Sequence, residues 1–244
     1  MKKTIFTLAI VFLSLSNFAQ STTWFSISAR GGFGTAMFIN VPSLEDSNID
    51  YGYFSPSYNY GGRFGFMFGD YVGVSGIVGM STLSQNYDIH GTSEIHRLLK
   101  TNTFDYGVLI NLETPTGFYF EIGPKFSNLN SANLTTTGDN LNSTVDIKSK
   151  FSPEFTNLMF GIGMKVMMTK LFEIKVGLSG AYNFGGIVSE SGYIIPAADK
   201  VIYTPTYIDQ KTNPAQLMFS VEFTYIFGRF GKASCGKYRF LLNN

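Results

Sequence analysis

The segment LMFSVEFTYIF (217–227) restricts the fold more than any other feature of the chain. Leu217, Phe219, Val221, Phe223 and Tyr225 alternate with a second set that contains a serine, a glutamate and a threonine. A period of two is typical of a β-strand with one apolar face. Seven further segments alternate in the same way: 23–38, 58–68, 71–83, 102–112, 118–127, 155–168 and 172–184. We therefore expect an all-β fold with eight antiparallel strands.

The charged residues indicate which face of these strands points inward. Nine lie in the predicted strands, each opposite its segment's apolar face: Arg30, Arg63, Asp105, Glu121, Lys125, Lys165, Glu173, Lys175 and Glu222. A soluble barrel of the lipocalin type would carry its charges outward, and more of them. Only 14% of this chain is charged, and it contains 24 Phe and 14 Tyr. The near-balance of acids and bases favours a charge network in a narrow lumen, because a buried charge needs a partner. The apolar face then contacts lipid.

The lengths of the connections favour an up-and-down transmembrane β-barrel. Short connections (69–70, 113–117 and 169–171) alternate with long polar ones (39–57, 84–101, 128–154 and 185–214). An even number of strands, short turns at one end and long loops at the other are typical of bacterial outer-membrane barrels. We expect four long extracellular loops and a location in the outer membrane.

The short turns also predict a register. If residue 112 lies opposite residue 118, Asp105 lies directly opposite Lys125, and the two form an ion pair. The same reasoning places Lys165 beside Lys175, with Glu173 one step away. This group needs a second carboxylate, and Glu121 is the candidate.

The two ends of the chain have their own signatures. Residues 1–19 resemble a secretory signal peptide, with two lysines, a short apolar run and a cleavage site after Ala19. A membrane anchor is the alternative, but the apolar run is short for one. Residues 20–228 form the predicted barrel. We expect residues 229–244 to form a basic periplasmic tail, which is a plug, a docking peptide or a disordered segment. Alternatively, its KYRFLL motif holds the terminal insertion signal, which would change the number of strands.

Few residues suggest chemistry. We predict no catalytic, cofactor-binding or metal-binding residues, and the near-neutral charge gives no indication of a nucleic-acid partner. His90 and His96 share one polar connection with Ser93 and Glu94. A lipid A deacylase-like enzyme that uses a loop histidine is therefore an alternative. The single cysteine, Cys235, excludes an internal disulfide and a multi-cysteine metal site.

The stretches GFYFEIGPKFS (117–127) and FGIGMKVMMTKLFEIKVGLSGAYNFGGI (160–187) resemble the PorT-like outer-membrane β-barrel group common in Bacteroidota. The resemblance covers most of the chain and rests on strands, turns and glycines. It implies an eight-stranded barrel and carries over no functional residues.

We expect a non-enzymatic barrel with a plugged lumen, since eight strands leave room only for side chains. Its role would be envelope structure, surface interaction or service as an accessory subunit of a secretion or assembly complex. The expected partners are outer-membrane lipid, lipopolysaccharide and envelope proteins that contact the loops or the tail. A small transporter for apolar solutes is a further alternative.

Overall fold

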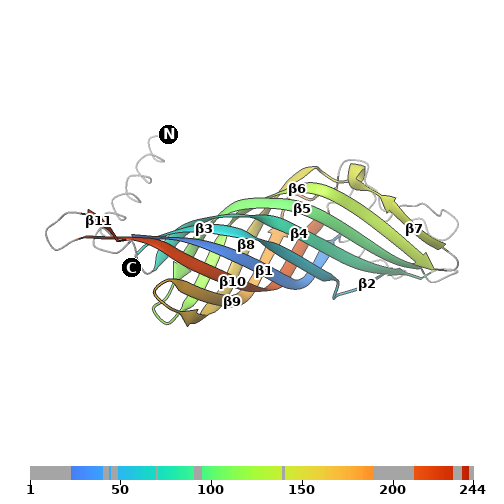
Figure 1. The fold of residues 1–244 in the computed structure, drawn as a ribbon. Coiled ribbons are helices and arrows are strands. Elements are labelled where there is room, and N and C mark those ends of the chain that lie inside the picture. Colours follow the sequence, from blue (N-terminus) through green and yellow to red (C-terminus); the bar gives the residue numbers. More distant parts are fainter. Residues whose placement is uncertain are drawn as a thin grey trace, which may run out of the picture.

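The computed structural model describes residues 23–40, 44, 49–69, 71–90, 95–138, 141–188, 212–232 and 238–241. Eight antiparallel strands form a closed ring, because the first and the last strand pair with each other. These strands are β1 (Thr23–Ile39), β3 (Pro56–Phe68), β4 (Val72–Ile89), β5 (Ile95–Glu113), β6 (Phe118–Gly138), β8 (Glu154–Met168), β9 (Phe172–Asn183) and β10 (Asn213–Lys232) (Figure 1). The predicted fold is confirmed. Within the described residues, no helix is both long and apolar enough to cross a membrane.

Two of the four predicted long loops are mostly strand. β4 and β5 continue into a hairpin with only residues 90–94 between them, and β6 runs on to Gly138. Two short strands, β2 (Ile49–Tyr51) and β7 (Leu141–Asp146), flank this hairpin by pairing with β4 and β6. A five-stranded sheet, in the order β2-β4-β5-β6-β7, therefore continues the barrel wall at one end (Figure 1). We call this sheet the extension; it comprises β2, β7 and residues 82–89, 95–102 and 131–138.

The strands exchange the polarity of their two faces where the extension begins. In the barrel below it, apolar side chains point outward; in the extension, apolar side chains point inward and are buried. A large core fills the inside of the extension and includes Tyr87, Ile95, Leu99, Leu134 and Phe151. The last of these follows the 3₁₀ helix η1 (Lys148–Lys150), which leads from β7 back to β8. The structure thus explains why the polar connections 84–101 and 128–154 were mistaken for loops.

The outward face of the barrel below the extension is an apolar band. On β5 the outward residues from Leu112 to Phe104 are each 39–52% exposed. At about 3.4 Å per residue this stretch measures roughly 30 Å along a tilted strand, which suits a hydrocarbon core. The predicted orientation, with aromatic and aliphatic side chains outward and charges inward, is therefore present.

Pro124 interrupts the ladder between β5 and β6. The two strands pair up to Gly107 and again from Ile110, and the register is the same on both sides of the interruption. Proline has no N–H to donate, so it removes a ladder hydrogen bond. Behind this point the side chain of Leu109 is fully buried.

The predicted ends of the chain are only partly described. The signal peptide and Cys235 lie outside the described residues. The tail does not begin as a separate segment after residue 228: β10 continues to Lys232 and pairs with β11 (Tyr238–Leu241). This hairpin lies at the short-turn end of the barrel, opposite β2 and β7 (Figure 1).

Candidate functional site

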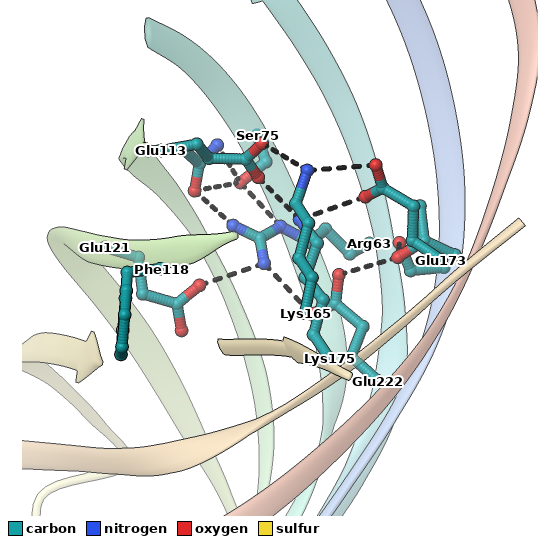
Figure 2. Close-up of polar contacts among 12 residues, drawn as sticks. Arg63, Ser75, Glu113, Phe118, Glu121, Lys165, Glu173, Lys175 and Glu222 are labelled. Atoms are coloured by element: carbon teal, nitrogen blue, oxygen red, sulfur yellow. Dashed lines mark hydrogen bonds and ion pairs between the residues drawn. The ribbon is translucent and has the colours of Figure 1, made fainter. Parts of the chain in front are cut away.

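The lumen holds the polar side chains that the sequence predicted to be central. Four of them form a middle cluster: Arg30, Arg63, Glu121 and Glu222. Glu121 is fully buried and contacts both guanidinium groups. It accepts a hydrogen bond from Arg30, and its Oε2 lies 2.9 Å from Arg63 Nη1. Arg63 Nη1 also lies 2.9 Å from Glu222 Oε2 (Figure 2). Ser75 adds an acceptor 2.9 Å from Arg63 Nε.

A second cluster lies toward the short turns and consists of Lys165, Lys175, Glu173 and Glu113. The two lysines are register partners on β8 and β9, as predicted. Lys165 Nζ lies 2.9 Å from Glu173 Oε1 and 2.6 Å from Glu113 Oε2, and Lys175 Nζ lies 2.7 Å from Glu113 Oε1 (Figure 2). The prediction that Glu121 supplies the second carboxylate of this cluster was therefore wrong. Glu113 takes that role because it is the last residue of β5 and points inward, whereas the sequence placed it in a turn.

The predicted ion pair between Asp105 and Lys125 forms, with Lys125 Nζ 3.1 Å from Asp105 Oδ2. The register behind it differs from the prediction. Leu112 lies opposite Phe120 instead of residue 118, so Asp105 faces Ser127 and Lys125 faces Gly107. A shift of two residues keeps every side chain on its face. The longer lysine therefore reaches the carboxylate diagonally.

Ten inward charges of the membrane-spanning barrel balance one another, with the five bases Arg30, Arg63, Lys125, Lys165 and Lys175 and the five acids Asp105, Glu113, Glu121, Glu173 and Glu222. Each of these side chains is at most 10% exposed and has an oppositely charged atom within 3.1 Å. Of these ten, sequence analysis missed only Glu113; a further buried base on the inward face of β5, Arg97, lies in the extension and had been assigned to the polar connection 84–101. The position of Glu113 after Leu112 continues the inward set of Asp105 and Asn111, which is a signal that could have identified it.

Apolar side chains lie above, below and between the charged clusters. Trp24, Met67 and Ile226 form a buried group at the short-turn end, where Lys165 Nζ lies 5.8 Å from the Trp24 ring. A second group of Leu109, Met159 and Ala181 lies within the barrel. A cavity of about 60 Å³ between the middle cluster and the Asp105–Lys125 pair is bordered by Gly61 and Gly79.

His96 lies on the extension, His90 directly follows β4, and neither histidine points into the lumen. His90 Nε2 is 2.9 Å from Asp50 Oδ2, and His96 Nδ1 is 2.6 Å from Asp88 Oδ1. All four side chains are substantially exposed. Ser93 and Glu94, the other members of the predicted set, lie outside the described residues. Within the described part of the chain, no three His, Cys, Asp or Glu residues are arranged to hold a metal ion.

The family described as "Outer membrane protein beta-barrel domain" matches residues 5–227. No curated protein resembles the chain in sequence. Among solved structures, Neisserial surface protein A is 12% identical with a TM-score of 0.40, and the alignment covers 84% of this chain and 98% of that one. OprG from Pseudomonas aeruginosa is 14% identical with a TM-score of 0.36, covering 85% and 98% of the two chains. Ail of Yersinia pestis is 12% identical with a TM-score of 0.36, covering 85% and 99%. Likenesses this distant add nothing to the family match.

Proposed function

Since this chain belongs to the outer membrane protein β-barrel domain family and resides in the outer membrane, we propose that it is a non-enzymatic barrel with a plugged lumen. Its short turns then face the periplasm, and its long-loop end faces outside. It acts in envelope structure, in surface interaction or as an accessory subunit of an envelope complex. Membership of the PorT-like group is part of this proposal and is supported by the strand and turn pattern of 117–127 and 160–187.

The observation that carries this proposal is the filling of the lumen by paired charges and apolar groups. Ion pairs connect five acids and five bases on seven strands. Displacing one of these side chains from the lumen would therefore leave an opposite charge buried without that partner. Apolar groups lie on both sides of them. An eight-stranded barrel has room only for such a filling. A molecule built in this way offers its outer surfaces to partners and not a path to solutes.

The purified protein is therefore expected to give no conductance steps when inserted into planar phospholipid bilayers. A 16- to 18-stranded porin, whose lumen is an aqueous channel, serves as the positive control. Regular steps from the correctly folded protein would overturn the plugged lumen. They would favour the transporter alternative, for which the interrupted β5–β6 ladder at Pro124 would be the first region to test.

Loss of both histidines is expected to leave the lipids of the outer membrane unchanged. His90 and His96 lie beside carboxylates, which is also the arrangement of a catalytic base and its orienting acid. Cells that produce the His90→Ala/His96→Ala variant should have the same lipid A mass spectrum as cells that produce the original protein or none. A lipid A species that depends on the original chain and disappears with the variant would establish the enzyme alternative.

A further inference from the structure

The outer face of the extension continues the lipid-facing wall of the barrel without a break. β5 has 19 residues, whereas about 9–11 suffice for a strand that crosses a membrane. Its outward residues are apolar from Leu112 to Phe104 and then become Asn102, Lys100, Leu98 and His96. β4 changes after Met80 and β6 after Phe126, which are at the same level of the sheet. The boundary of the hydrocarbon core therefore passes beneath the extension.

Small amide and hydroxyl side chains dominate this outer face. Thr82 Oγ1 donates to Asn102 Oδ1 at 2.7 Å, and Asn102 Nδ2 donates to Ser131 Oγ at 2.8 Å. Farther from the membrane, the Thr135 and Thr144 hydroxyls on β6 and β7 lie 3.1 Å apart. Among the described residues of this face, none is aromatic and only Leu98 is a large exposed apolar side chain. Protein interfaces instead concentrate Trp, Tyr and other large anchors.

The same face is hollowed near its centre. A cavity of about 390 Å³ is lined by Asn86, Asp88, His96, Leu98, Thr135 and Thr137, among others. This volume falls within the range of about 300–1,000 Å³ that is typical of small-ligand sites. The lining offers donors and acceptors on several sides and one short apolar wall from Leu98, which suits a polyhydroxylated ligand.

We propose that the outer face of the extension binds the core saccharide of lipopolysaccharide molecules in the surrounding outer leaflet. The inference rests on the proposed function, because it requires that the barrel stands in the outer membrane with the extension outside. Lipid molecules of the same leaflet surround the barrel and therefore contact this face from the side. Their acyl chains contact the apolar band below, and their phosphates and sugars therefore lie at the height of the extension.

The charged residues on this face are arranged in the order of the phosphates and sugars of lipopolysaccharide. Lys100 is exposed and lies on β5 four residues beyond Phe104, close to the hydrocarbon boundary where phosphates lie. Asp50 and Asp88 are register partners farther from the membrane. Carboxylates repel phosphate but accept hydrogen bonds from sugar hydroxyls. The face thus offers a cation near the lipid anchor and carboxylate, amide and hydroxyl acceptors above it, beside Arg97 and His96 in the lining of the hollow.

Binding of three purified glycolipid and lipid probes to the full chain in detergent micelles tests the proposal. The probes are lipopolysaccharide, lipid A (the same anchor without the core saccharide) and phosphatidylglycerol, and native mass spectrometry counts the bound molecules. Lipopolysaccharide is expected to bind more tightly than the other two. The Lys100→Ala/Thr135→Val variant loses one or two hydrogen bonds and should bind lipopolysaccharide about tenfold more weakly. Its binding of lipid A should weaken less, because lipid A lacks the saccharide and shares only the phosphate contact of Lys100.

The control variant is Ser143→Val/Lys148→Ala, which makes similar changes at exposed residues: Ser143 pairs with the inward Thr136, and Lys148 belongs to η1, which is not part of the extension. It should bind lipopolysaccharide as the original protein does. Asn86→Ala alone tests the hollow with less disturbance of the sheet and should also weaken binding. Equal binding of lipopolysaccharide and lipid A, unchanged binding by the face variants, or an equal loss in the control would each overturn the proposal. None of these outcomes affects the conductance result, so the proposed function is judged separately.

Discussion

Replacing Glu121 by glutamine is expected to destabilise the folded barrel by about 3–5 kcal/mol, the usual cost of removing one partner of a buried ion pair. Glu121 is fully buried and holds the guanidinium groups of both Arg30 and Arg63. The glutamine keeps the size of the side chain but leaves Arg30 facing a neutral group. Arg63 retains Glu222. Urea unfolding in phospholipid vesicles, followed by the fluorescence of the single tryptophan, Trp24, measures the loss.

The matched control is Glu154→Gln, an exposed carboxylate at the start of β8, which should change stability by less than about 0.5 kcal/mol. The Arg30→Met/Glu121→Gln variant removes both charges together. It should be more stable than the sum of the two single changes predicts, by about 0.5–3 kcal/mol. A Glu121→Gln variant as stable as the Glu154→Gln control would mean that these lumen charges are solvated.

The sequence was sufficient for the membrane-spanning part of the fold because one rule holds along its whole length. Apolar residues alternate with polar ones, and each charge lies on the polar face, as Arg63 and Glu222 do. Errors of register did not alter the faces, because the actual shift between β5 and β6 is two residues. The Asp105–Lys125 pair therefore survived a wrong alignment.

The extension could not be predicted from the same rule, because its strands turn their polar face outward and their apolar face inward. This is the reverse of the barrel below. Leu99 points into a buried core while its neighbour Lys100 points outward. In the barrel below, Asp105 points inward while Tyr106 points outward. Read as one pattern, the alternation loses its phase near residue 102 and looks like a polar loop. Glu113 was missed because it directly precedes a short turn and was assigned to that turn, although it continues the inward set of β5.

Replacing Ile162 by arginine should destabilise the barrel by about 2–4 kcal/mol in a phospholipid bilayer, the cost of a cation on the lipid face near mid-membrane. Ile162 is 58% exposed on the isolated chain and is the middle member of the outward set Leu158, Phe160, Ile162, Met164 and Val166 on β8. The matched change, Leu98→Arg, places the same cation at an exposed apolar residue of the extension, beyond the hydrocarbon core, and should cost only about 0–1 kcal/mol. Urea unfolding in vesicles that contain no glycolipid compares the two without interference from a saccharide ligand. In water both changes would be mild, because an exposed surface position tolerates arginine. Equal effects at the two positions would therefore mean that no lipid covers the apolar band, and that the alternation of these strands has another cause.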